Sequence, residues 1–210
     1  MIKFTLRGDR TMKKTGLYGG SFDPVHNGHI KTALVFKEQM DLDKVLIMPA
    51  KRPPNKLNAE LADNYHRITM CKLAFEDYKG FEISDAEIKR RGVSYTCDTL
   101  RSLSSEKFGR IYLLCGADMF LTLQNWKNPE IIFSLADIVT VPRDKDDLCV
   151  LEEHKKVLEK LGARIHIIDT PKIDVSSTQI RKMISENKSI AGLVPKSVEN
   201  YICEKGLYGG

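Results

Sequence analysis

One stretch near the amino terminus constrains the fold of this chain more than any other. It follows a short apolar run and reads Gly19-Gly20-Ser21-Phe22-Asp23-Pro24-Val25-His26-Asn27-Gly28-His29-Ile30. Glycine lets the backbone approach an anion closely, because it lacks the Cβ that would collide with it. The first turn of a helix adds unpaired N–H donors and the positive end of the helix dipole. The order of apolar run, glycine turn and helix start therefore predicts a phosphate-binding turn.

The two histidines of this stretch sharpen the prediction. His26 and His29 are three residues apart, so both project from one face of the first helical turn. Each can donate to a phosphate oxygen, and a protonated imidazole would add charge where charge develops. A single histidine at a helix start is usually a solvated or capping residue. Two of them around a glycine, after Asp-Pro and a strand, favour nucleotide phosphates as the ligand.

Short apolar or β-branched runs alternate along the chain with longer segments of helical spacing. The expected strands are 15–18, 44–49, 81–84, 111–115, 137–141 and 164–168. The expected helices are 28–40, 64–78, 96–108, 128–135, 148–161, 177–186 and 197–204. This alternation predicts an α/β fold with a doubly wound parallel sheet. Such sheets bind ligands beyond the carboxyl ends of their strands, at the switch in strand order, and the glycine turn follows the first strand.

Length, charge and cysteine usage limit the class of protein. With 210 residues, 42% of them hydrophobic, the chain suits one domain, which we expect at 14–205 after an appendage at 1–13. No apolar run approaches a membrane span, and the basic start lacks the apolar core of a secretory signal. Five cysteines without a C-x-x-C pair favour a reducing, cytoplasmic location over disulfides or structural zinc. The net charge of +5 is diffuse and does not by itself indicate nucleic acid.

Two further segments call for an interpretation. Residues 50–63 are rich in Pro, Asn and Lys without periodicity, which predicts a long loop at the mouth of the site. The pentapeptide Gly-Leu-Tyr-Gly-Gly occurs at 16–20 and again at 206–210. The sequences around the two copies are dissimilar, so we interpret the repetition as coincidence.

A hydroxyl-rich segment near the carboxyl terminus complements the glycine turn. It reads Val175-Ser176-Ser177-Thr178-Gln179-Ile180-Arg181. Its hydroxyl groups cap a helix, and Arg181 follows one turn later on the same face. Such a helix start can hold a triphosphate and neutralise a departing pyrophosphate. Alone, the segment would indicate an ordinary helix cap and an exposed arginine.

Together, the two segments resemble the signatures of the HxGH nucleotidylyltransferases, a superfamily related in fold to class I aminoacyl-tRNA synthetases. The second signature, ISSTxIR, differs here only by valine at its first position. The resemblance implies a Rossmann-like fold and transfer of a nucleoside monophosphate from a nucleoside triphosphate to a phosphate. It implies catalytic roles for His26, His29 and Arg181. ATP would be bound by Gly19, Gly20, Ser21, Phe22, Gly116, Ser177 and Thr178.

The segments between the signatures point to one branch of the superfamily. Gly116-Ala117-Asp118 with Leu123 and Trp126 fits G-x-D followed by L-x-x-W, and residues 94–100 fit SYTxDTL. Both patterns are typical of bacterial nicotinate-nucleotide adenylyltransferases. Residues 53–56 resemble that family's PPHK loop, with asparagine where histidine is frequent. The resemblance implies that nicotinate mononucleotide is held by Asn55, Lys56, Thr96, Asp118, Trp126 and Arg143.

The implied reaction transfers AMP from ATP to nicotinate mononucleotide, giving deamido-NAD and pyrophosphate in NAD biosynthesis. Mg²⁺ would accompany ATP through its phosphates and water, since no carboxylate cluster suggests a protein metal site. The expected partners are these small molecules, without nucleic acid or membrane, and a homo-oligomer stays open. Phosphopantetheine adenylyltransferase shares both signatures but lacks the intermediate segments. A nucleic-acid-binding module is a distant alternative, because it needs a concentrated basic surface.

Overall fold

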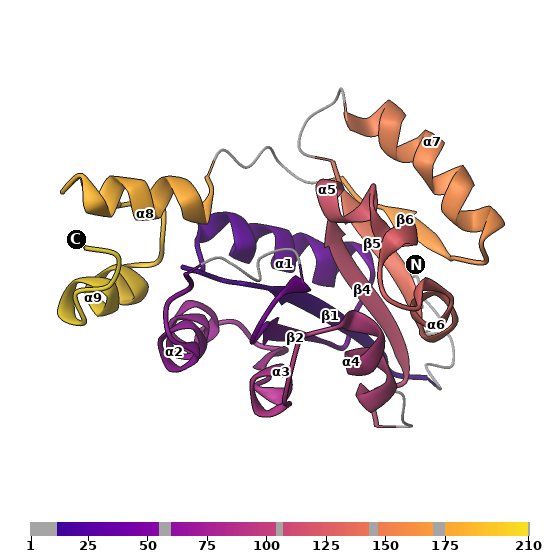
Figure 1. The fold of residues 1–210 in the computed structure, drawn as a ribbon, viewed down its shortest axis with the longest axis horizontal. Helices are drawn as coiled ribbons and strands as arrows, with labels where there is room; N and C mark the ends of the chain where they lie inside the picture. Colours follow the sequence, from indigo (N-terminus) through magenta and orange to yellow (C-terminus); the bar gives the residue numbers. More distant parts are fainter. Residues whose placement is uncertain (1–11, 55–59, 104–106, 143–146, 170–174, 210) are drawn as a thin grey trace, which may run out of the picture.

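The computed structural model describes residues 12–54, 60–103, 107–142, 147–169 and 175–209. Within these ranges, parallel strands form one six-stranded sheet in the order β3-β2-β1-β4-β5-β6 (Figure 1). The strands are β1 Lys14–Gly20, β2 Lys44–Pro49, β3 Phe81–Ile83, β4 Arg110–Gly116, β5 Ala136–Val141 and β6 Ile165–Ile167. The predicted doubly wound parallel sheet is confirmed.

The strand order reverses between β1 and β4, the two strands at the centre of the sheet. They pair in parallel, from Lys14 beside Arg110 to Tyr18 beside Leu114. The chain runs outward from β1 through β2 to β3, then crosses back to β4 and runs outward the other way. The carboxyl ends of β1 and β4 therefore meet at the switch point, where sheets of this order bind nucleotides.

Helices cover both faces of the sheet, and each face has its own apolar core. On one face lie α1 Asn27–Gln39, α2 Asn64–Phe75, α8 Ser177–Ser185 and α9 Lys196–Glu204. On the other lie α4 Thr96–Leu103, α5 Ala117–Phe120, α6 Pro129–Leu135 and α7 Asp147–Lys160. Side chains of a strand alternate between the faces, so Val45 and Ile47 enter the first core, and Leu46 and Met48 the second.

The helix predictions need correction at two ends and at three short elements. The expected helix 64–78 ends at Phe75, and 96–108 ends as a helix at Leu103, with Lys107 and Phe108 in a turn. Gly109 then adopts a φ of 64° in the turn that leads into β4. The prediction omitted α5, α3 Ala86–Lys89 and the 3₁₀-helix η2 Leu123–Asn125. Elements of three or four residues are too short to show a helical period.

The packed region continues past residue 205, the expected end of the domain. After α9, the backbone N–H of Leu207 donates to the Ile202 carbonyl at 3.0 Å, which folds the chain back. Leu207 and Tyr208 then pack against the apolar core on the face of the sheet covered by α1, α2, α8 and α9. The carboxyl-terminal residues thereby reach the region of the glycine turn.

Candidate active site

The glycine turn leaves β1 through a tightly folded aromatic residue. Phe22 is buried, and its φ of 48° lies in the left-handed region that side chains rarely adopt. Its ring packs edge-on against Tyr18, with centroids 5.4 Å apart, and against His29 at 5.0 Å. A Cβ on Gly20 would stand 3.1 Å from the Phe22 ring, so glycine leaves room for this arrangement. The turn is thus shaped by a glycine and a buried ring.

The two histidines stack on each other at the start of α1. Their ring centroids are 3.7 Å apart with an interplanar angle of 32°. The backbone N–H of His26 donates to His29 Nδ1 at 3.2 Å. Because His29 Nδ1 accepts this bond, the neutral ring carries its proton on Nε2. The predicted proximity of the pair is present.

Burial sets the protonation of His26. The side chain is 6% exposed, and desolvation lowers the pKa of His26 from 6.5 to about 4. Among the described residues, its Nδ1 is a buried nitrogen without a hydrogen-bond partner. Without a bound anion, His26 is therefore neutral near pH 7, and a phosphate is the kind of ligand that would favour its charged form.

Helix α8 joins the two signature segments. Ser177 Oγ donates to the Pro24 carbonyl at 2.9 Å, and Arg181 Nη1 donates to the Asp23 carbonyl at 2.6 Å. Ser176 caps the helix, accepting from the Gln179 N–H at 3.2 Å. Residues more than 150 positions apart in the sequence thus form one unit at the switch point. Thr178 lies exposed in the first turn of this helix.

Sequence reasoning missed two buried charges behind the glycine turn. Asp23 and Arg67 are each 1% exposed. The Arg67 guanidinium donates to the carbonyls of Ser21 at 2.7 Å and Ala62 at 3.0 Å, and also to Asn64 Oδ1. Burial lowers the pKa of Arg67, and the Asp23 carboxylate opposes that shift. The Tyr65-His66-Arg67 segment was visible in the sequence, but nothing in it indicated that the arginine, rather than an apolar neighbour, points inward.

The residues expected to hold the acceptor follow β4. Gly116 ends the strand, exposed and with nothing within 4 Å of an added Cβ, so the backbone is open to a ligand. Asp118 is exposed in the first turn of α5. Trp126 is half-buried, and its Nε1 donates to Thr122 Oγ1 at 3.4 Å. A strand end, a carboxylate and an indole thus stand within a span of eleven residues beside the glycine turn.

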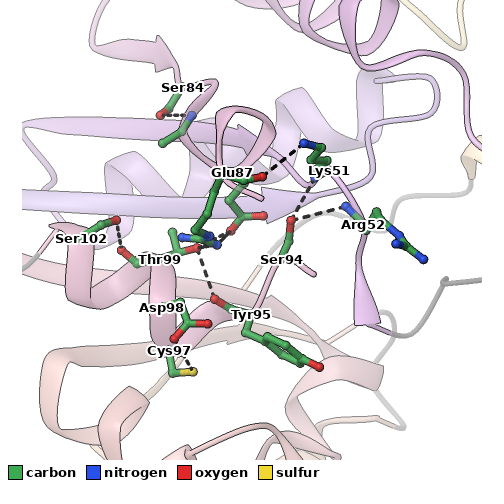
Figure 2. Close-up of polar contacts among 12 residues, drawn as sticks. Lys51, Arg52, Ser84, Glu87, Ser94, Tyr95, Cys97, Asp98, Thr99 and Ser102 are labelled. Carbon is green, nitrogen blue, oxygen red and sulfur yellow. Dashed lines mark hydrogen bonds and ion pairs between the residues drawn. The ribbon is translucent and has the colours of Figure 1, made fainter. Parts of the chain in front are cut away.

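The start of α4 is held by side-chain contacts with the loop after β2 (Figure 2). Buried Ser94 accepts from the backbone N–H of Lys51 at 3.0 Å and of Arg52 at 3.5 Å, while its own N–H donates to the Arg52 carbonyl at 3.0 Å. Further along, Thr99 Oγ1 donates to buried Glu87 at 2.6 Å. These bonds fix the backbone that leads into Thr96, the first residue of α4.

A lysine links the tryptophan segment to the same helix start. Lys127 Nζ lies 3.5 Å from Asp98 Oδ2 and 4.2 Å from the centre of the Tyr95 ring. The structure therefore brings the segments around Thr96 and Trp126 together. Of the remaining expected acceptor residues, Asn55, Lys56 and Arg143 lie outside the described residues.

The described ranges offer neither a cluster of metal ligands nor a helix suited to a membrane. No group of three or more His, Cys, Asp or Glu side chains is arranged there to hold a metal ion. Of the helices formed by those ranges, none combines the length and apolar character that a membrane crossing requires.

A family model described as cytidylyltransferase-like matches residues 17–183. Among curated proteins, a probable nicotinate-nucleotide adenylyltransferase of Desulfatibacillum aliphaticivorans is 37% identical, covering 93% of this chain and 99% of its own length. Another, from Lachnoclostridium phytofermentans, is 38% identical over 94% of this chain and 100% of its own.

Solved structures give the same picture of the fold. The Plasmodium falciparum nicotinic acid mononucleotide adenylyltransferase complexed with NaAD superposes with a TM-score of 0.77, covering 93% of this chain and 97% of that one. A second structure of it, complexed with APC, gives a TM-score of 0.74. Sequence identity to both is 18%, so this likeness concerns the fold.

Proposed function

The chain belongs to the nicotinate-nucleotide adenylyltransferases within the cytidylyltransferase-like family, and we propose that it joins AMP from ATP to nicotinate mononucleotide. The products are deamido-NAD and pyrophosphate. One observation carries the assignment of the site: Ser177 and Arg181 of α8 contact the Pro24 and Asp23 carbonyls, directly before the His26–His29 pair. This arrangement lies at the carboxyl end of β1, where the strand order reverses.

The proposed chemistry is a direct in-line displacement. A 5′-phosphate oxygen of the mononucleotide forms a bond to the α-phosphorus of ATP. The bond from that phosphorus to the bridging oxygen of the β-phosphate breaks, and its electrons leave with pyrophosphate. A phosphate oxygen is already a competent nucleophile, so the protein contributes positioning and charge stabilisation.

The ATP half of the site uses donors from both signatures. The Nε2–H of His29 donates to a phosphate oxygen, and His26 gains charge beside the same anion. Arg181 neutralises the departing pyrophosphate. The remaining contacts come from the backbone or hydroxyl groups of Gly19, Gly20, Ser21, Phe22, Gly116, Ser177 and Thr178.

The acceptor half recognises sugar, ring and carboxylate separately. Asp118 accepts from ribose hydroxyls, and the Trp126 ring stacks on the pyridine. The N–H groups at the start of α4, at Thr96, receive the nicotinate carboxylate. Asn55, Lys56 and Arg143 complete this half by contacting the mononucleotide phosphate and its surroundings.

Mg²⁺ enters as part of the substrate, the MgATP complex. Hard divalent cations of this size keep several waters and bind through substrate phosphates in many nucleotide sites. We place the enzyme in the cytoplasm, where ATP and the mononucleotide occur together.

Pyrophosphate release with MgATP tests the proposal, using nicotinate mononucleotide, nicotinamide mononucleotide and phosphopantetheine as acceptors. We expect a strong preference for nicotinate mononucleotide, because only this acceptor presents a carboxylate to the start of α4. Turnover with phosphopantetheine alone would retain the ATP half and overturn the roles of Asp118 and Trp126. Release with none of the three would refute the proposed reaction.

A further inference from the structure

The carboxyl-terminal residues reach back to the glycine turn. Tyr208 Oη donates to Asp23 Oδ1 at 2.8 Å, across 185 positions of sequence. The turn that brings it there is fixed by the Gly206 N–H to the Cys203 carbonyl and the Leu207 N–H to the Ile202 carbonyl. Figure 1 shows the carboxyl end beside α8 and α9, and Arg181 is a residue of α8.

Asp23 is a buried carboxylate whose two oxygens have different partners. Oδ1 accepts from Tyr208 Oη and, at 3.1 Å, from the Ala62 N–H. Among the described residues, Oδ2 has no hydrogen-bond donor, and Arg181 Nη1 lies 3.6 Å from it. A buried carboxylate without enough donors is costly, so it attracts the nearest cation. The nearest cation here is the one expected to bind pyrophosphate.

Arg181 is therefore shared between the protein and the substrate. Its Nη1 donates to the Asp23 carbonyl at 2.6 Å and its Nη2 to Thr178 Oγ1 at 3.4 Å, and the remaining N–H groups of the guanidinium can face phosphate. If Oδ1 lost the Tyr208 hydroxyl, the carboxylate would compensate by drawing Arg181 closer. An arginine held more tightly by Asp23 is less available to neutralise a developing charge.

We propose that Tyr208 is a positioning residue: its hydroxyl satisfies Asp23 and so keeps Arg181 available to the phosphates of ATP. This inference rests on the proposed function of the site. Two further features support it. Tyr208 adopts a φ of 66°, a left-handed conformation that costs a non-glycine residue on the order of 1 kcal/mol. Burial and the nearby Asp23 raise the pKa of Tyr208, so its hydroxyl stays a donor at neutral and mildly alkaline pH.

The alternative is that Tyr208 only packs its ring against the core. Tyr208→Phe separates the two roles, because it keeps the ring and removes the hydroxyl. Tyr201→Phe is the matched control: Tyr201 belongs to the same carboxyl-terminal region, and its Oη lies 2.8 Å from His66 Nδ1. Both variants lose one hydroxyl from a contact of equal length, but only one contact involves Asp23.

Steady-state kinetics with MgATP and nicotinate mononucleotide supply the first readout. We expect Tyr208→Phe to lower kcat about tenfold, an effect smaller than the full contribution of a hydrogen bond to a charged group. The KM for nicotinate mononucleotide should not change, and Tyr201→Phe should match the wild type in kcat. An unchanged kcat in Tyr208→Phe, or an equal loss in both variants, would overturn the proposal.

A double-mutant cycle supplies the second readout, which a merely structural role would not move. In an Arg181→Ala background, removing the Tyr208 hydroxyl should have no further effect on kcat, because the residue it acts through is gone. Equal losses in both backgrounds would show that Tyr208 acts independently of Arg181. Wild-type enzyme that is inactive with nicotinate mononucleotide would instead refute the proposed function. Calorimetric titration with a non-hydrolysable ATP analogue would then test the positioning role of Tyr208, which predicts weaker binding by Tyr208→Phe than by Tyr201→Phe.

Discussion

The two halves of the site are held in different ways. The glycine turn, which we assign to the ATP half, accepts hydrogen bonds from the side chains of Arg67 in α2, Arg181 in α8 and Tyr208 after α9. Two of the groups behind it, Asp23 and Arg67, are almost fully buried. The described residues that we propose for acceptor binding instead lie at the surface: Asp118 is exposed and Trp126 half-buried. Hydrogen bonds of Ser94 fix the backbone that leads to the start of α4.

This difference matches the chemistry proposed for each half. Charge stabilisation in a transition state depends on donors that do not have to reorganise, and buried braces keep them in place. Recognition of an acceptor ring and ribose depends on surfaces that meet the ligand directly. Substitutions in the ATP half should therefore lower stability or kcat, and those in the acceptor half should raise the KM for one substrate.

The largest effect should come from the buried brace, Arg67. Arg67→Met leaves the carbonyls of Ser21 and Ala62 without their donor inside the protein. We expect the free energy of unfolding to fall by about 3 kcal/mol, the scale for breaking a buried charged network. Urea denaturation measures it, with Lys72→Met on the exposed side of α2 as the control. If Arg67→Met loses no more free energy of unfolding than Lys72→Met, Arg67 does not stabilise the glycine turn.

Removal of the His29 imidazole should act on turnover. We expect His29→Ala to lower kcat about 10²-fold or more, the scale for one donor that stabilises developing charge. The free energy of unfolding should change much less. His66→Ala is the control, since the hydrogen bond of the His66 ring is made with Tyr201. Near wild-type turnover in His29→Ala would take this residue out of the mechanism.

The buried neutral state of His26 should make stability depend on pH. The pKa of His26 is about 4 in the folded protein and near 6.5 in the unfolded chain. Between these two pH values the unfolded chain binds a proton at this ring and the folded protein does not. The stability from keeping this ring neutral is present above pH 6.5 and is lost as the pH falls toward 4. Between pH 7 and pH 5 the loss from this residue should be about 2 kcal/mol. Denaturation at both values compares wild type with His26→Gln, and an equal pH dependence in the two would contradict the assignment.

Trp126 provides the corresponding test in the acceptor half. Trp126→Ala should raise the KM for nicotinate mononucleotide about tenfold, the scale for losing one aromatic stacking contact. The KM for ATP should stay near that of the wild type, and Trp126→Phe should recover most of the loss. A change confined to the KM for ATP would place the indole in the other half.

The sequence predicted the parts of the site that depend on local patterns. Glycines, paired histidines and a capped helix leave periodic or positional signals, and the predicted fold and family are confirmed. The His26 and His29 rings lie against each other, and Ser177 contacts the Pro24 carbonyl two residues before His26. The roles of these residues in binding and catalysis stay predictions. The burial of Asp23 and Arg67 was missed because burial of a charge depends on distant segments. Tyr208 was missed for the same reason. It lies in the second copy of Gly-Leu-Tyr-Gly-Gly, and nothing in that local sequence indicates a contact 185 positions away.

The smallest effect should come from Ser94, which fixes backbone rather than touching a ligand. Ser94→Ala removes the acceptor of the Lys51 N–H but keeps the Ser94 N–H bond to the Arg52 carbonyl. The loss of one neutral hydrogen bond, about 1 kcal/mol, should raise the KM for nicotinate mononucleotide a few fold. Ser102→Ala is the control, because Ser102 Oγ donates to the Thr99 carbonyl further along α4. A rise in the KM for ATP instead would mean that the two halves of the site are not held separately. The loop after β2 is connected to the glycine turn by the hydrogen bond from the Ala50 N–H to the Gly20 carbonyl. A displacement of this loop would then reach the ATP half through that bond.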